Sequence, residues 1–301
     1  MEVEQHRMRR VGAADYALLT GLGMVFGSSF LFTNVAVQSI PPFTVVASRI
    51  TLAALVILVT LRIKSEPLPS GSVWRWIFAS ALFGNAIPFS LISWGQQQVD
   101  AGLTAIFMAV MPLTTVVLAH FVTSDEKLNR WTFCGVWFGL IGVVVLMGWA
   151  ALSQLGGQSM SQLAILMGAM CYAVNALITR KLTGLKKWPM SAGLLLAAAV
   201  LTIPMALIVD KPWQIVPDAS SIWAVVALAI GPTALATWLI LVIIGRQGAS
   251  FLSQINFIVP VFGVLFGVLF LHERLPANAW LALGIILFGV ALARQGGRQS
   301  G

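Results

Sequence analysis

Residues 101–128 read AGLTAIFMAVMPLTTVVLAHFVTSDEKL, and residues 249–275 read ASFLSQINFIVPVFGVLFGVLFLHERL. Each stretch is a long apolar run with a proline inside it, Pro112 or Pro260, and each ends on an acidic residue, a basic residue and leucine. The two prolines are 148 residues apart, and the two acidic residues are 147 apart. A fixed separation indicates an internal repeat. Each run exceeds the roughly 20 apolar residues of a membrane-spanning helix, so the repeating unit is predicted to lie in a membrane.

Composition agrees with a lipid environment. Hydrophobic residues make up 58% of the chain and charged residues 9%, whereas a soluble domain is about 25% charged. The net charge of +8 does not indicate nucleic-acid binding, because the basic residues lie in short clusters between apolar runs. We expect those clusters to contact lipid headgroups. The two cysteines, Cys134 and Cys171, are too few for a disulfide framework.

Ten apolar runs are predicted to be membrane-spanning helices, which makes the fold an all-α integral membrane protein. The runs are continuous, whereas membrane strands alternate apolar and polar residues. The first run is too long for the core of a signal peptide, so it is predicted to be retained. The ten runs are Ala17–Val37, Phe43–Leu61, Trp74–Trp94, Ala101–Val122, Trp131–Trp149, Leu163–Thr179, Ser191–Val209, Ile222–Ile243, Ala249–Leu271 and Ala279–Ala293.

The basic residues support this count and predict the orientation. With both termini in the cytoplasm, 15 basic residues fall in cytoplasmic segments and only Lys211 and Arg274 fall outside. This bias is what the positive-inside rule requires of a multi-pass inner-membrane protein. The cytoplasmic set is Arg7, Arg9, Arg10, Arg62, Lys64, Arg75, Lys127, Arg130, Arg180, Lys181, Lys186, Lys187, Arg246, Arg294 and Arg298.

Each half of the chain has five predicted helices, an odd number, so the second half enters the membrane upside down. Inverted repeats recur in secondary transporters, where the substrate site lies near the middle of the membrane between the halves. The predicted organisation is a cytoplasmic segment (1–14), a first five-helix repeat (15–150), an inverted second repeat (161–293) and a cytoplasmic tail (294–301).

The ten helices, the two halves, the prolines in helices four and nine and the acidic-basic-Leu endings resemble the EamA-domain branch of the drug/metabolite transporter superfamily. The resemblance covers roughly residues 15–293. The aromatic-rich interior without acidic groups is similar to YddG-type exporters of amino acids. The resemblance implies that the chain exports amino acids, neutral and aromatic ones included, and related metabolites by alternating access.

Ionisable residues are scarce inside the predicted helices. No carboxylate lies in the middle of a run, which argues against a buried proton-coupling acid, and no cluster of ligands predicts a metal ion or another cofactor. Arg49 is the exception and is a candidate anchor for a carboxylate or phosphate. The alternatives are that it reaches the outer interface or pairs with backbone carbonyls. His120, near the end of helix four, is either a proton-handling group or a hydrogen-bonded helix-end residue.

Neutral polar and methionine side chains interrupt six of the runs, often on one face, and predict a central cavity. The alternative for each is a hydrogen bond between helices, worth about 0.6 kcal/mol. Four prolines are candidate kinks or gates, or else static kinks. The cavity candidates are Ser28, Asn34, Asn85, Met108, Met111, Tyr172, Asn175, Thr233, Thr237, Trp238 and Asn256, and the prolines are Pro88, Pro112, Pro232 and Pro260.

Three functions stay open at this point. The first is an exporter whose substrate is an amino acid or a related metabolite. The second is a multidrug or sugar-phosphate-like carrier, although such carriers are expected to show a buried acid or several buried basic residues. The third is an intramembrane hydrolase, for which Ser28 and His120 are the only conceivable pair. No catalytic residue is predicted, and the sequence leaves the substrate, the coupling ion and the choice between monomer and homodimer open.

Overall fold

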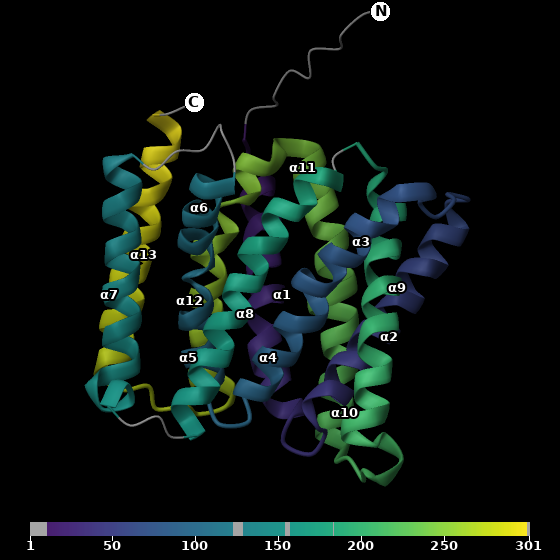
Figure 1. Cartoon of the computed structure of the whole chain (residues 1–301), viewed down its shortest axis with the longest axis horizontal. Helices are drawn as coiled ribbons and strands as arrows, with labels where there is room; N and C mark the ends of the chain where they lie inside the picture. The colour runs from purple at the N-terminus through teal and green to yellow at the C-terminus, as the bar shows by residue number, and fades with distance from the viewer. Residues whose placement is uncertain (1–10, 123–128, 154–156, 183, 300–301) are drawn as a thin grey trace, which may run out of the picture.

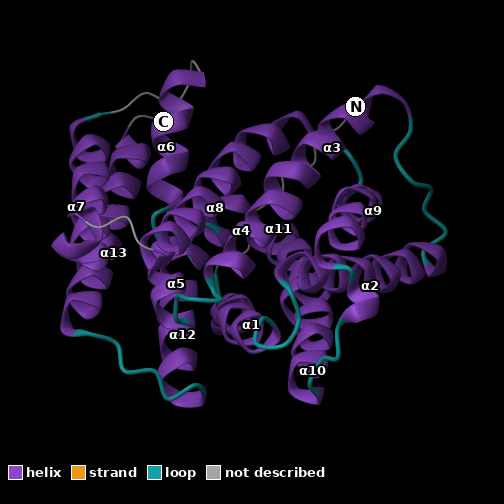
Figure 2. Ribbon diagram, turned by 60° about the horizontal axis from the view of Figure 1, so that its bottom comes forward, coloured by secondary structure: helices purple, strands orange, loops and turns teal. Residues whose placement is uncertain are grey.

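The computed structural model describes residues 11–122, 129–153, 157–182 and 184–299, and every regular element in these ranges is a helix. The helices form a bundle in which α1 (Ala13–Ala36) begins and α13 (Ala277–Gln299) ends on the same face (Figure 1). We call this the upper face and the opposite one the lower face. In a second view, α1 lies among the other helices and α7 (Arg130–Ser153) with α13 forms one edge (Figure 2).

Nine helical segments of the described chain are long and apolar enough to cross a membrane. Several contain more than one element, because short 3-10 or π turns interrupt the α-helix. The nine are Ala13–Ala36, Pro42–Ile63, Gly71–Gly95, Ala101–Val122, Arg130–Gly148, Gln158–Leu182, Lys187–Asp210, Ala219–Gly248 and Ala277–Gln295. One short turn, η5 (Pro212–Gln214), lies in a loop between two of these segments. Besides α1, α7 and α13, the elements that make up the nine segments are α2 (Pro42–Ile63), η1 (Gly71–Val73), α3 (Trp74–Ala81), η2 (Leu82–Ala86), α4 (Ile87–Gly95), α5 (Ala101–Met108), α6 (Met111–Val122), α8 (Gly157–Thr179), η3 (Arg180–Leu182), α9 (Lys187–Met205), η4 (Ala206–Asp210), α10 (Ala219–Leu228), η6 (Ala229–Leu235) and α11 (Ala236–Leu252).

The remaining predicted run, 249–271, is divided. Its first residues continue α11 beyond a kink at Gly248, where φ is 81°, and a turn then separates them from α12 (Ile255–Phe270). At 16 residues, α12 is shorter than a full span, so the count of ten stays a prediction. The fourth run is divided as well, between Met108 and Met111. Pro112 removes the donor for the Met108 carbonyl at this break.

The α7–α13 pair lies at the periphery and forms the left edge of the bundle (Figure 1). The two backbones touch through glycine. A Cβ atom on Gly289 would lie 2.6 Å from the carbonyl oxygen of Gly135. Small residues at such crossings allow the close packing that holds membrane helices together.

Replacing Gly289 with leucine is therefore expected to separate α7 from α13. Overpacking of this kind costs about 1–3 kcal/mol, so thermal unfolding of the purified variant should begin at a lower temperature. The matched control is Gly284→Leu on the same helix, because a Cβ there meets nothing within 4 Å. Equal melting temperatures for the two variants would contradict this account of the pair.

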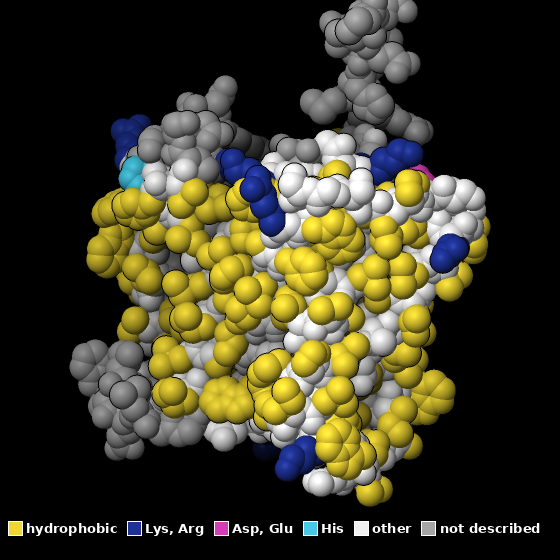
Figure 3. Space-filling view, turned by 45° about the vertical axis from the view of Figure 1, so that its right-hand side comes forward, with side chains coloured by type: hydrophobic (Ala, Val, Ile, Leu, Met, Phe, Trp, Pro, Cys, Tyr) yellow, Lys and Arg dark blue, Asp and Glu magenta, His cyan; other side chains and the backbone are white. Residues whose placement is uncertain are grey.

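Basic residues gather at the upper face. The end of α2, the η3 turn, the end of α11 and the start of α9 carry Arg62, Lys181, Arg246 and Lys187 there. A space-filling view shows Lys and Arg mostly along the upper rim, above a broad hydrophobic surface (Figure 3). This arrangement is consistent with a cytoplasmic upper face under the positive-inside rule, and the orientation itself stays a prediction.

Candidate functional site

The described residues contain three π turns, and two of them lie at the same place in each half of the chain. In the span Gly71–Gly95, residues Leu82–Ala86 (η2) form a π turn, and in the span Ala219–Gly248 residues Ala229–Leu235 (η6) do so around Pro232. The two turns begin 147 residues apart, which is the separation of the sequence motifs. Because π turns are rare and frequently lie at functional sites, a site is expected beside them.

Thr233 replaces the hydrogen bond that Pro232 removes. Proline has no N–H, so the carbonyl of Leu228, four residues earlier, loses its helical donor. The Thr233 hydroxyl donates to that carbonyl at 2.8 Å. The same oxygen accepts a hydrogen bond of 3.1 Å from the guanidinium of Arg49 on α2. Two consecutive hydrogen bonds therefore hold the Arg49 head group against the π turn of η6.

Arg49 is buried among aromatic rings. Its side chain is 4% exposed, so the guanidinium is shielded from solvent by the surrounding helices. The guanidinium carbon lies 4.0 Å from the centre of the Phe89 ring on α4. That ring meets Tyr172 of α8 edge-on, with 6.3 Å between centroids. These residues, Arg49, Phe89, Tyr172 and Thr233, are called the Arg49 cluster below.

In the part of the chain that the structure describes, the charge of Arg49 has no counter-ion. Its Nε is buried and has no hydrogen-bond partner, and within the described ranges no carboxylate pairs with the guanidinium. The contact with Phe89 offsets only part of the cost of burying a cation, since cation–π contacts are worth about 0.5–2 kcal/mol. An anion brought to this position would gain both the free donor and the uncompensated charge.

A second polar pair lies one turn along α8 from Tyr172. The Ser80 hydroxyl of α3 donates to the side-chain oxygen of Asn175 at 2.6 Å. Gly84 in the η2 turn leaves room for this amide, because a Cβ there would lie 2.7 Å from the Asn175 side-chain carbon and would also collide with its nitrogen. Tyr172 and Asn175 are three residues apart and share one face of α8. The Arg49 cluster and this pair thus belong to one polar surface.

Gly84→Ala is expected to displace Asn175 and break its bond to Ser80. The penalty should fall when Asn175→Ala is already present, because the shorter side chain no longer meets the new methyl group. A double-mutant cycle on thermal unfolding should show a coupling of about 0.5–3 kcal/mol. Gly231→Ala, at the corresponding place in η6, is the control, since a Cβ there meets nothing within 4 Å. Additive effects of the two site substitutions would contradict the contact.

The other cavity candidates are more dispersed. Thr237 donates to the Thr233 carbonyl, Ser28 donates to the Val25 carbonyl one turn earlier, and Asn34 donates to the Gln96 carbonyl at 3.4 Å. Met108 packs against the apolar cores on either side of α5. Four further candidates are half-buried: Asn85, Met111, Asn256 and Pro112. The kink candidates Pro88, Pro232 and Pro260 are buried.

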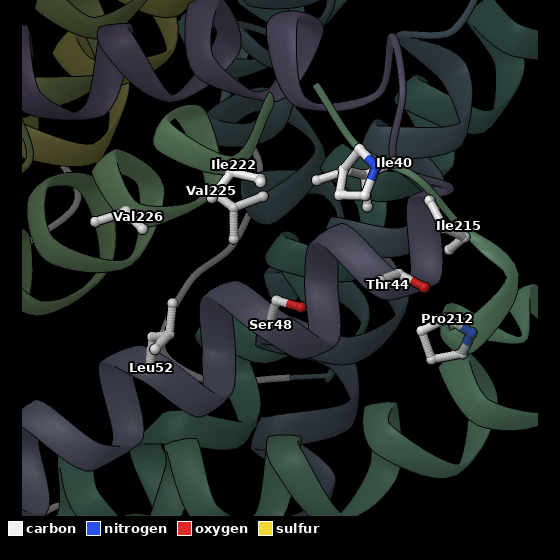
Figure 4. Close-up of a pocket in the computed structure, with 10 residues that line it drawn as sticks. Ile40, Thr44, Ser48, Leu52, Pro212, Ile215, Ile222, Val225 and Val226 are labelled. Atoms are coloured by element: carbon white, nitrogen blue, oxygen red, sulfur yellow. The ribbon is translucent and has the colours of Figure 1, made fainter. Parts of the chain in front are cut away.

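Two cavities lie along the seam between α2 and the span Ala219–Gly248. The lower cavity, of about 270 Å³, lies between α2 and α10; Thr44, Ser48 and Leu52 form a stripe on α2 that faces Val225 and Val226 (Figure 4). The upper cavity, of about 480 Å³, lies between the end of α2, the start of α9 and α11. Trp238, 44% exposed, lines the upper cavity and lies apart from the Arg49 cluster. Along the span Ala219–Gly248, Thr233 lies between the residues that line the lower cavity and those that line the upper cavity.

Carboxylates join the two halves of the chain on both faces. At the upper face, Asp15 of α1 is buried, forms an ion pair of 3.2 Å with Arg246 and accepts a hydrogen bond of 2.7 Å from Gln247, both on α11. At the lower face, Asp210 accepts hydrogen bonds from the backbone N–H and the hydroxyl of Thr44, at 2.6 and 2.9 Å. We call these the upper and lower ties.

Glu273 makes a second lower tie. Its two carboxylate oxygens accept hydrogen bonds from the N–H groups of Ala101 and Gly102, at 2.7 and 2.8 Å, where α5 begins. Burial raises the pKa of the Glu273 carboxyl above its ordinary value, and the two N–H donors oppose that shift. The counterpart in the sequence repeat, Glu126, lies outside the described residues.

Sequence reasoning missed several partners in this arrangement. Phe89 is one of 17 phenylalanines, and nothing in the pattern separates it from a core or lipid-facing ring. Asp15 and Asp210 lie just outside the predicted runs, and nothing in the sequence singles them out. Their pairing with the other half follows from tertiary packing, which a helix-by-helix pattern does not contain.

Comparison with known proteins gives one family. The model of the EamA-like transporter family matches residues 15–148 and again residues 159–295. The chain is 25% identical to the uncharacterized inner membrane transporter YedA of Escherichia coli K12, over 93% of this chain and 90% of that one. It is 23% identical to a probable amino-acid metabolite efflux pump of the same strain, over 89% and 90%.

One solved structure supports the fold. A crystal structure titled only as that of a protein matches with a TM-score of 0.67 at 21% identity, over 95% of this chain and 99% of that chain. This likeness concerns the fold alone.

Proposed function

Because the chain belongs to the EamA-like transporter family and is a multi-pass protein of the inner membrane, we propose that it exports amino acids and related metabolites by alternating access. The family makes it a membrane transporter of the drug/metabolite type. The relative named as a probable amino-acid metabolite efflux pump favours this class of substrate. The neutral and aromatic lining of the Arg49 cluster suits neutral and aromatic amino acids.

The observation that carries the proposal is the buried, unpaired Arg49. A carboxylate is the group that amino acids and their oxidised or acylated relatives share, and a guanidinium binds it through two parallel donors. Phe89 and Tyr172 lie beside the charge and would contact the apolar part of the substrate. A sugar-phosphate carrier, the second candidate, would be expected to place further basic residues beside Arg49.

Alternating access has support from the two π turns. Broken helices at matching positions of two repeats are the usual place of a substrate site in transporters of inverted-repeat architecture. Here the η2 and η6 turns lie beside the Asn175 pair and the Arg49 cluster, respectively. Their looser backbone would allow one half to move while the other stays packed.

The test is uptake of labelled amino acids by liposomes that contain the purified protein, with and without a pH gradient. We expect uptake that needs no pH gradient, because no carboxylate of the described chain neighbours Arg49. Asn175→Ala should lower it more than Asn256→Ala, since only Asn175 belongs to the polar surface next to the cluster. Absence of uptake for every amino acid would refute the substrate assignment, and uptake that follows the pH gradient would refute transport without proton coupling.

A further inference from the structure

The upper cavity is independent of the Arg49 cluster and has a composition of its own. Its charged lining consists of Lys64, Lys186 and Lys187 together with Glu66. Two indole rings, Trp188 and Trp238, complete the wall. Three ammonium groups and one carboxylate give the cavity two net positive charges.

The lysines lie where they would meet the membrane surface. They come from the end of α2 and the start of α9, on the upper face, whose rim carries most of the visible basic side chains (Figure 3). The Lys64 ammonium lies 5.4 Å from the centre of the Trp188 ring, which holds it against the cavity wall. Basic pockets between helices at this depth are suited to phosphate headgroups.

The start of α9 adds backbone donors to these charges. Lys186 caps the helix without a side-chain hydrogen bond, and Pro189, the third helical residue, has no N–H. The N–H groups of Lys187 and Trp188 therefore have no helical acceptor within the described chain and can donate to another one. Helix N-termini bind phosphate because free N–H groups and the helix dipole act together. The 19-residue α9 is long enough for that dipole.

Glu66 provides an independent observation that points to a ligand. Its Oε2 is buried and has no hydrogen-bond partner among the residues that the structure describes. A buried acceptor in this state is costly, and a donor from outside the protein, either a water molecule or a ligand, would satisfy it. A ligand that satisfies both the lysines and Glu66 would carry a phosphate and, next to it, a hydroxyl or amine donor. Because the cavity has two net positive charges, an anionic headgroup with hydroxyl donors matches it better than a zwitterionic headgroup with an amine donor.

The apolar surroundings indicate that the ligand has hydrocarbon chains. Leu241 and Val242 form the inner wall of the cavity. On α2, which contributes Lys64 to the cavity, Val59 and Ile63 are exposed hydrophobic residues, the latter 79% exposed. Hydrocarbon chains attached to a headgroup in the cavity would lie along this surface.

From this geometry we propose that the upper cavity binds the headgroup of phosphatidylglycerol. The phosphate accepts hydrogen bonds from the lysines and from the N-terminus of α9, and the glycerol hydroxyls donate to Glu66. The acyl chains lie along the exposed side of α2. A soluble phosphate ester shares this headgroup chemistry, and the test separates it from the lipid.

The experiment is native mass spectrometry of the full chain in detergent, titrated with phosphatidylglycerol, phosphatidylcholine or glycerol 3-phosphate. We expect phosphatidylglycerol to bind more tightly than phosphatidylcholine, whose quaternary ammonium cannot donate to Glu66. Binding of phosphatidylglycerol should weaken about fivefold in each of the variants Lys64→Gln, Lys186→Gln and Lys187→Gln. Arg75→Gln, Lys181→Gln and Arg130→Gln remove the same charge from the same face and should have smaller effects.

Glu66→Ala tests the contact with the glycerol separately from the contact with the phosphate. The substitution should weaken the binding of phosphatidylglycerol. The binding of phosphatidic acid, which has no glycerol hydroxyls beyond its phosphate, should be as tight as in the parent or tighter. Equal binding of phosphatidylglycerol and phosphatidylcholine, or equal losses in the lysine and control variants, would overturn the proposal. Binding of glycerol 3-phosphate without selective binding of phosphatidylglycerol would also overturn it and would assign the cavity to a soluble ester.

Discussion

Replacing Arg49 with glutamine is expected to lower uptake of carboxylate-bearing substrates by about 10- to 100-fold, because a hydrogen bond to a charged group contributes about 1.5–3 kcal/mol. The guanidinium of Arg49 is buried, has a free Nε and has no carboxylate partner within the described chain. Glutamine keeps a donor for Thr233 but carries no charge. The measurement is initial uptake of a labelled amino acid by liposomes, compared with the parent at equal protein content.

Matched variants separate the charge from the packing. Arg49→Lys keeps the charge and should retain more uptake than Arg49→Gln, although an ammonium cannot bind a carboxylate through two parallel donors. Thr233→Ser keeps the hydroxyl that links Arg49 to the Leu228 carbonyl and should stay close to the parent. Thr233→Val removes that hydroxyl and should reduce uptake.

Thermal unfolding provides the control for folding, because a buried arginine also contributes to stability. A purely structural Arg49 would lower the melting temperature and reduce uptake of every substrate alike. If Arg49 anchors the substrate carboxylate, the loss of uptake should be confined to substrates that carry a carboxylate. An amine that lacks the carboxyl group should be transported equally poorly by the parent and by Arg49→Gln. Unchanged uptake of the amino acid by a folded Arg49→Gln variant would contradict the role of Arg49 as an anchor.

The sequence predicts the spans and singles out Arg49, because both depend on hydrophobicity along the chain. It also predicts that Pro112 and Pro232 disturb their helices, since the missing N–H is a property of proline itself. It does not predict that Thr233 repairs the break at Pro232 and binds Arg49 with the same oxygen, because that contact joins residues 184 apart in the chain.

Trp238 shows a limit of one-dimensional reasoning at the same span. It is one residue from Thr237, and successive helical residues point about 100° apart. Thr237 bonds to the Thr233 carbonyl, whereas Trp238 lies in the upper cavity beside Trp188. A sequence pattern groups the two as neighbours, and only the three-dimensional arrangement of the helices assigns them to different surfaces.

The ties between the two halves predict opposite effects on the two faces of the membrane. In alternating access the halves separate on one face at a time, so the Asp15 tie must break for the upper face to open, and the Asp210 and Glu273 ties must break for the lower face. Loss of a charged hydrogen bond shifts such an equilibrium by about tenfold or more. Asp15→Asn should favour the state open at the upper face, and Asp210→Asn combined with Glu273→Gln should favour the state open at the lower face.

The measurement is labelling of Asn175→Cys, in a background of Cys134→Ser and Cys171→Ala, by a membrane-impermeant thiol reagent added from either side. Position 175 lies on the polar surface of α8, next to the Arg49 cluster, and is half-buried, so its labelling rate from each side should rise when that face opens. Asp15→Asn should raise the labelling rate from the upper face and lower it from the lower face, and the lower-tie variant should do the reverse. The reciprocal change is the critical result, because a general loosening of the bundle would raise both rates together. Parallel increases, or no change in either variant, would mean that the three carboxylates only stabilise the fold.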